Sequence, residues 1–139
     1  MNELQRIDQD KSRAAHNILS QSHGVDAETR SRMRQLPARL RASGLAATYA
    51  FLRSKQGNEK AVERAYRDLV IGIAHHLRDL GLVDFPENQD DPGMILQQRF
   101  ANANTGTYAR MSAEVDELAI WLSRLADALH KEPELSGES

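Results

Sequence analysis

The last third of the chain carries the most regular apolar pattern in the sequence. Between Thr105 and Leu129, large apolar side chains recur three or four residues apart, at Tyr108, Met111, Val115, Leu118, Leu122, Leu125 and Leu129. This spacing puts one apolar stripe along one face of an α-helix, as in the seam of a coiled coil. It predicts a long C-terminal helix, capped by Thr105, whose apolar face other helices must cover.

The rest of the chain also shows helical spacing, and no segment has the alternation of β-branched residues that is typical of a strand. We expect further helices over about 3–20, 26–42, 44–56 and 59–80, and a short one over about 94–100. Asp26 should cap the second helix, Pro37 should break or kink it, and Gly81 should end the fourth. Lys11 is a polar residue on the otherwise apolar face of the first helix. The segment 84–92 holds four acids, two prolines and no base, which is typical of an exposed loop.

These elements predict an all-α fold, a single compact bundle of about five to six helices with a long C-terminal helix. A chain of 139 residues is long enough for one hydrophobic core. We expect one domain over 1–131 and a disordered tail over 132–139. The sequence has no cysteine, no apolar leader and no apolar run near the roughly 18 residues of a membrane span. We therefore expect a cytoplasmic protein.

The middle of the chain is strongly basic, although the protein as a whole has a formal net charge of -2. No acid occurs from Thr29 to Asn58, while seven bases do, at Arg30, Arg32, Arg34, Arg39, Arg41, Arg53 and Lys55. The next predicted helix adds Lys60, Arg64 and Arg67 at i, i+4 and i+7, on one helical face. Ten of the eighteen Lys and Arg residues therefore fall within residues 30–67, and the remainder of the molecule is acidic.

Such a charge distribution suits a protein that lays one side along a phosphate backbone. Arginine fits this role because its planar guanidinium can bind two phosphate oxygens at once. The candidate phosphate contacts are Arg34, Arg39, Arg41, Arg53, Lys55, Lys60, Arg64 and Arg67. A solvated helix face rich in arginine is the alternative interpretation, and the role of Arg30 and Arg32 is left open.

No residue pattern indicates catalysis or a metal site. His75 and His76 are neighbours on a predicted helix, so they point about 100° apart and do not converge on one metal ion. Asp90 and Asp91 lie in the acidic loop with nothing to activate them, and Glu114 is expected at the surface of the last helix. The sequence also lacks a glycine-rich phosphate loop and a GxSxG motif. We therefore expect neither an enzyme nor a cofactor or metal site.

Two aromatic residues are candidate anchors of a protein interface. Trp121 lies beside the seam of the last helix, and Phe51 lies across its helix from Leu45. Tryptophan is enriched at interfaces. The alternative is that each residue simply widens a buried apolar face.

Three segments together resemble a known protein family. They are IDQDKSRAAHNIL at 7–19, LPARLRASGLAATYAFLRSK at 36–55 and TGTYARMSAEVDELAIWLSRLADAL at 105–129. In this order they are similar to the small, all-helical subunit of the Cmr-type, type III-B CRISPR RNA-guided interference complex. The middle segment is the most specific, and none of the three is an active-site motif.

The resemblance implies a noncatalytic role in antiviral defence. In this family, copies of the small subunit stack along the ribonucleoprotein, beside the repeated backbone subunits that hold the guide RNA, and help to hold the target RNA. RNA cleavage belongs to the backbone subunits, and the other nucleotide chemistry to the large subunit. The implied partners are therefore other Cmr subunits, guide and target RNA, and further copies of this chain, with the basic segment facing the groove between guide and target.

Three other interpretations stay open at this point. The first is the small subunit of the related type III-A (Csm) complex, which shares the helical architecture and the role. The second is a helical adaptor that binds protein through Trp121 and the C-terminal seam. The third is a helix-turn-helix DNA-binding protein built on the joint from Arg39 to Lys55.

Overall fold

The computed structural model describes residues 3–21 and 25–130, and within them it contains six α-helices and no strand. The helices are α1 (Glu3–Gln21), α2 (Ala27–Ser43), α3 (Leu45–Lys55), α4 (Ala61–Asp79), α5 (Pro92–Asn102) and α6 (Thr105–Leu129). The predicted all-α bundle with a long C-terminal helix is confirmed. The expected disordered tail, 132–139, lies outside the described residues, and the single domain over 1–131 stays a prediction.

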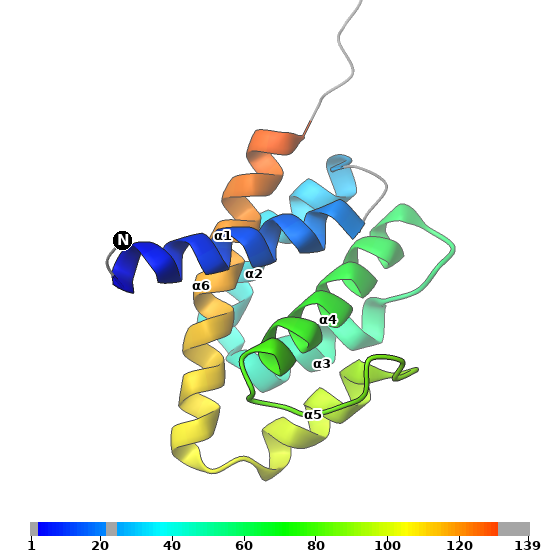
Figure 1. Ribbon diagram of the computed structural model, residues 1–139. Coiled ribbons are helices and arrows are strands. Elements are labelled where there is room, and N and C mark those ends of the chain that lie inside the picture. Colours follow the sequence, from blue (N-terminus) through cyan, green and yellow to red (C-terminus); the bar gives the residue numbers. More distant parts are fainter. Residues whose placement is uncertain (1–2, 22–24, 131–139) are drawn as a thin grey trace, which may run out of the picture.

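The last helix forms the spine against which the first two helices pack. α1 and α2 both make their main contacts with α6, and α1 also crosses α4 (Figure 1). A second group forms where α3 packs between α4 and α5. Contacts between α2 and both α3 and α4 join the two groups.

One hydrophobic core runs through all six helices. Its fully buried side chains include Met33, Leu52, Leu69, Leu96 and Met111. Tyr49 of α3 is buried among them with its hydroxyl donating to the Val70 carbonyl oxygen at 2.6 Å, and burial raises the pKa of this phenol. The phenol therefore ties α3 to α4 without leaving its polar atom unsatisfied.

The structure confirms the predicted ends of two helices. The Asp26 side chain accepts from the Thr29 amide at 2.7 Å, as an N-cap does. Gly81 has φ 76° after α4, and the Leu82 amide donates to the Leu77 carbonyl at 2.9 Å. This is the Schellman arrangement, in which glycine takes the left-handed position that closes the helix.

Three details differ from the expectation. The cap of α6 is Asn104, whose side chain accepts from the Thr107 amide at 2.8 Å, because Thr105 is already the first helical residue. Asp91 is not merely a solvated loop acid, since it caps α5 by accepting from the Met94 amide at 3.1 Å. α2 does not break at Pro37, because burial of the apolar side chains on both sides of it outweighs the one lost backbone hydrogen bond, and a kink there stays a prediction.

The polar residue on the apolar face of α1 has a partner far along the chain. Lys11 is buried and forms an ion pair with Glu114 of α6, which is half-buried rather than at the surface. His76 of α4 lies beside this pair with its Nε2 buried and without a hydrogen-bond partner in the described structure. Burial, and then the charge of Lys11, lower the pKa of His76 to about 4.

This arrangement makes stability depend on pH. In the unfolded chain His76 has a pKa near 6.5, so the unfolded state binds a proton first as the pH falls. The free energy of unfolding should therefore decrease from about pH 6.5 to about pH 4, by at most about 3 kcal/mol from this residue. Urea unfolding of the wild type and His76→Gln across this range measures it. The pH slope should shrink in His76→Gln and persist in His75→Gln, and equal slopes in all three proteins would contradict the assignment.

A second constraint is the close approach of α1 and α4 at Gly72. A Cβ atom there would lie 2.6 Å from Cγ1 of Ile18. No side chain fits at this distance unless α1 or Ile18 moves. Glycine therefore allows α1 and α4 to approach this closely with the Ile18 side chain in its present position.

Gly72→Ala should lower the free energy of unfolding by about 1 kcal/mol. Overpacking against Ile18 costs about 1–3 kcal/mol, whereas the gain in helix propensity is only about 1 kcal/mol. The matched control is Gly106→Ala, also in a helix, where the nearest atom to the new Cβ is 3.6 Å away. Urea unfolding should show a loss for the first variant and none for the second, and a Gly72→Ala protein as stable as the wild type would refute the packing argument.

Candidate functional site

The eight candidate phosphate contacts fall into different surroundings. Arg39 of α2 and Lys55 of α3 come together at Phe51, and Arg41 is exposed on α2. The other five, which are Arg34, Arg53, Lys60, Arg64 and Arg67, lie apart from this cluster or have partners within the protein, as described below. The basic segment of the sequence is therefore not one uniform surface.

Arg39 and Lys55 share one aromatic ring. The Arg39 guanidinium carbon lies 4.2 Å from the centroid of Phe51, and the Lys55 ammonium lies 5.8 Å from the same centroid. Both distances are within the range of cation–π attraction. The two charges therefore lie within about 10 Å of each other although they belong to different helices.

The ring of Phe51 also packs against a second aromatic ring. Tyr66 of α4 meets Phe51 edge to face, with centroids 5.8 Å apart at 84°. The Tyr66 oxygen accepts from Nη1 of Arg32 at 3.1 Å, and the Arg32 guanidinium lies 5.6 Å from the Tyr66 centroid. We call Arg32, Arg39, Phe51, Lys55 and Tyr66 the cation–aromatic cluster. The role of Arg32 was left open from the sequence, and Tyr66 was not among the candidates, because only the packing of α2, α3 and α4 brings them to Phe51.

The cations of the cluster differ in whether a carboxylate neutralises them. Arg32 pairs with Glu28 at 3.4 Å. By contrast, Arg39, Arg41 and Lys55 pair with no carboxylate in the described part of the chain. The donors of these three residues are therefore available to an external anion.

The flank of α2 that faces α6 has less free charge. Asp127 of α6 accepts from Nε of Arg30 at 2.8 Å and lies 3.9 Å from Nε of Arg34. The hydrogen bond from Arg30, with the charge of Arg34, lowers the pKa of Asp127, so this carboxylate stays ionised. Arg34 therefore shares a carboxylate that an incoming phosphate would have to displace.

The basic residues at the start of α4 hold a loop. Nη1 of Arg64 donates to the carbonyl oxygens of Asn58 at 3.1 Å and Glu59 at 3.0 Å, and Arg67 donates to the side chain of Asn58. Lys60, the exposed residue just before α4, has its amide within 3.4 Å of Glu63 Oε1. These contacts fix the connection between α3 and α4.

Arg53 points toward α5 rather than toward Phe51. It is half-buried, and its Nε is enclosed without a hydrogen-bond partner in the described structure. Its charge partly offsets the effect of burial on the pKa of Tyr49, so the two groups lie close together. Arg53 is therefore less available to a large anion than Arg39.

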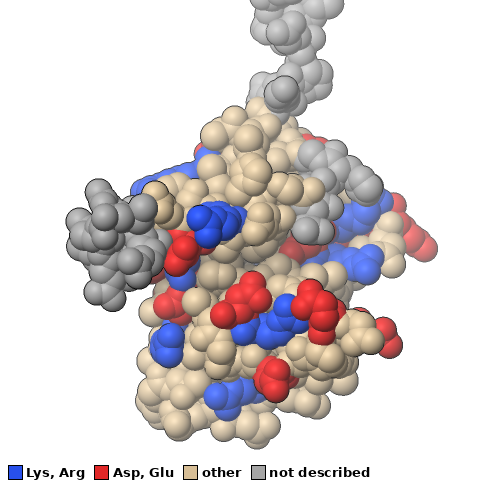
Figure 2. Space-filling view, viewed as in Figure 1, with Lys and Arg blue, Asp and Glu red and all other residues tan. Residues whose placement is uncertain are grey.

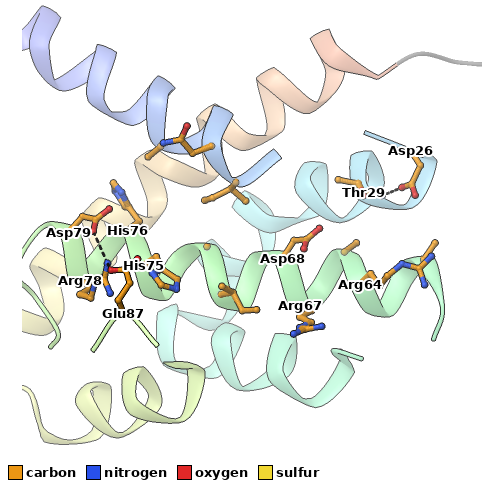
Figure 3. A pocket seen from close by; sticks show the side chains of 17 residues that line it. Asp26, Thr29, Arg64, Arg67, Asp68, His75, His76, Arg78, Asp79 and Glu87 are labelled. Atoms are coloured by element: carbon orange, nitrogen blue, oxygen red, sulfur yellow. Dashed lines mark hydrogen bonds and ion pairs between the residues drawn. The ribbon is translucent and has the colours of Figure 1, made fainter. Parts of the chain in front are cut away.

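A separate cleft of about 730 Å³ lies between α1 and α4. Its rim carries both signs of charge, and Arg78 pairs there with Glu87 at 2.6 Å and Asp79 at 3.7 Å (Figure 3). On the face that presents α1 and α4 to the viewer, basic and acidic side chains are interspersed (Figure 2). Arg64 and Arg67 line this cleft together with acidic residues, so its positive charge is more fully offset than that of Arg39, Arg41 and Lys55.

The two neighbouring histidines leave α4 in different directions. His76 points toward α1, whereas His75 points away from it (Figure 3). The ring centroid of His75 lies 5.4 Å from that of Phe85, in the loop after α4. Within residues 9–20 and 25–130, no three His, Asp or Glu side chains are grouped so that they could hold a metal ion. The two imidazoles diverge, as expected for neighbouring residues on a helix.

A protein-family comparison identifies the chain. The family model of the CRISPR-associated protein Cas_Cmr5 matches residues 5–129, which is nearly the whole sequence. The chain belongs to the Cmr5 family. It is thus a small subunit of the Cmr-type, type III-B CRISPR complex, and the type III-A alternative is not supported.

The fold agrees with that of a solved Cmr5 structure. A crystal structure of a CRISPR-associated Cmr5 family protein from Thermus thermophilus is similar with a TM-score of 0.62 and 24% sequence identity. The similarity covers 94% of this chain and 100% of the other. No curated protein matches the sequence. Among the described helices of this Cmr5 protein, none combines the length and apolar character that a membrane crossing requires.

The two aromatic interface candidates of this Cmr5 protein are in different positions. Trp121 is half-buried against the core, next to Ile120, which is 42% exposed on the outer side of α6. Phe51 is also half-buried against the core, with Arg39 over its ring. A role for either residue in binding another protein stays a prediction.

Proposed function

We propose that the protein is a noncatalytic subunit that binds the phosphate backbone of guide or target RNA through Arg39, Arg41 and Lys55. The observation that carries this proposal is the cation–aromatic cluster, in which Arg39 and Lys55 converge on one ring and have no carboxylate partner in the described structure. They also lie in a segment, residues 29–58, that contains no acid. The segment itself therefore contributes no carboxylate that would repel a polyanion.

Phosphate recognition is sufficient for this role. In an RNA-guided complex, base pairing between guide and target supplies sequence specificity, so a subunit needs to recognise only charge and shape. Arginine and lysine meet this need because their donors bind phosphate oxygens independently of the base. We assign catalysis to other subunits, and we place the complex in the cytoplasm as part of antiviral defence.

The five remaining candidates are proposed as secondary contacts, namely Arg34, Arg53, Lys60, Arg64 and Arg67. Phosphate binding to Arg34 competes with Asp127, and binding to Arg64 competes with carbonyl oxygens of the α3–α4 loop. In each case the free energy gained from the new phosphate contact is reduced by the free energy of the protein contact that is lost. Their substitution should therefore weaken RNA binding less than substitution of Arg39.

Contacts with other Cmr subunits, and with stacked copies of this chain, are proposed for the outer side of α6. There Ile120 is exposed beside half-buried Trp121. An exposed apolar residue next to tryptophan is typical of an interface anchor. The adaptor interpretation predicts binding of other proteins through Trp121. In this proposal, such binding is one part of the role of the subunit.

The double variant Arg39→Gln/Lys55→Gln tests the RNA surface in the assembled complex. Target-RNA affinity should fall roughly tenfold. The slope of log K against log salt should flatten by about 1.5, because each lost phosphate contact contributes roughly 0.7–0.9. Fluorescence anisotropy at several salt concentrations measures both.

The matched control is Arg13→Gln/Arg110→Gln, which removes the same charge from exposed positions on α1 and α6. It should leave the affinity and the salt slope unchanged. If both double variants behave like the wild type, or if both lose affinity equally, the proposed surface is wrong. Loss of the other subunits on co-purification of Trp121→Ala, with Arg39→Gln/Lys55→Gln still assembled, would show that the two surfaces have separate roles.

A further inference from the structure

We infer that Phe51 is a positioning residue that holds the Arg39 guanidinium for a phosphodiester, and that this site responds to the charge of a strand and not to its bases. The inference rests on the proposed function and extends it to the mode of recognition. Phe51 would otherwise be interpreted as a stacking platform, since aromatic rings beside basic residues commonly stack on the bases of single strands. The contacts of the ring decide between these roles.

The face of Phe51 beneath Arg39 is not free for a base. The Arg39 guanidinium covers the ring at 4.2 Å from its centroid. Tyr66 meets it at 84°, and Phe51 is itself half-buried against the core. A base could stack on this face only by displacing Arg39, the residue with which it would compete for the ring.

Stacking leaves the Arg39 donors available. The N–H groups of a guanidinium lie in the plane of that group. When a guanidinium lies on an aromatic ring, these N–H groups therefore point sideways and not into the ring. The hydrogen bond from Nη2 of Arg39 to Oε1 of Gln35 is 3.5 Å long and therefore weak. The Arg39 guanidinium is thus held close to the ring while its donors are still open to a phosphate.

The ring itself is anchored through a third helix. Tyr66 is 6% exposed, and its oxygen accepts from Arg32, which is held by Glu28. Arg32 is therefore a structural member of the cluster, with its charge already neutralised. Lys55 supplies a second open charge within about 10 Å of Arg39, a separation suited to one phosphodiester or to two neighbouring ones.

The same molecule contains a comparable pair whose charge is already satisfied. The Arg78 guanidinium lies 5.2 Å from the centroid of Phe85, but Arg78 is bound to Glu87 at 2.6 Å. This pair stabilises the loop after α4. The pair offers a matched control. Removal of the Phe85 ring should disturb Arg78 but should not affect RNA binding, because Arg78 is already paired with Glu87.

The first test needs no RNA. NMR spectra of the free, full-length protein should show the Arg39 side-chain δ and ε protons shifted upfield by the ring current of Phe51. The shift should disappear in Phe51→Leu and persist in Phe85→Leu. Unshifted Arg39 protons in the wild type would overturn the positioning role directly.

The second test measures recognition. In the assembled complex, Phe51→Leu and Arg39→Lys should each weaken target-RNA binding about three- to tenfold, although both keep the charge, while Phe85→Leu should not. In NMR titrations of the free chain, oligo(rA) and oligo(rU) should bind equally within about twofold. Thermal melts confirm that each variant is folded, and Arg39→Lys keeps the test valid if Phe51→Leu is too unstable.

The possible results separate the inference from the proposed function. If Arg39→Gln/Lys55→Gln weakens RNA binding but Phe51→Leu and Arg39→Lys do not, the surface binds RNA and the positioning role is wrong. A preference for oligo(rA) that Phe51→Leu abolishes would show a stacking platform instead. If none of these variants changes RNA binding, the RNA surface and the inference both fail, even where the ring-current shift is present.

Discussion

Burial of one face of α6 is the interaction on which the rest of the structure depends. Met111, Val115, Leu118 and Leu122 have no exposed area. The helices that cover them are α1 and α2, from the opposite end of the sequence. Because α2 turns its apolar side toward α6, Arg30 and Arg34 lie at the edge of this contact beside Asp127. Arg39 lies over the ring of Phe51 instead, and Arg41 is left exposed. The position of the candidate RNA surface is thus a consequence of how the C-terminal helix is covered.

The buried pair of Lys11 and Glu114 adds specificity to this packing. Removing two charges from water costs several kcal/mol per ion, so a buried pair contributes little net stability. Any register of α1 that separates the two residues leaves an uncompensated buried charge, which is far less favourable. The neutral His76 next to the pair completes a junction of α1, α4 and α6. We attribute the crossing of α1 to this junction and to the close approach at Gly72.

Local sequence signals predicted most of the fold, and contacts between distant residues account for what was missed. The apolar spacing, the Asp26 cap and the Gly81 stop are properties of neighbouring residues, and each is confirmed. Lys11 could be recognised as an anomaly but not explained, since its partner lies 103 residues away. The same limit applied to the site. The positions of the basic residues in the sequence do not reveal that Arg34 faces Asp127 or that Arg32 and Tyr66 support Phe51.

The basic residues of this chain therefore divide into two groups with different physical roles. Arg30, Arg32, Arg64 and Arg78 hold the fold together, because their donors are used by carboxylates or carbonyl oxygens. Arg39 and Lys55 gain their order from an aromatic ring instead. An aromatic ring restrains a cation and leaves its hydrogen-bond donors free, whereas a carboxylate restrains the cation and occupies those donors. A surface that must be rigid and still attract a polyanion needs the first kind of restraint, and Phe51 within the acid-free segment supplies it.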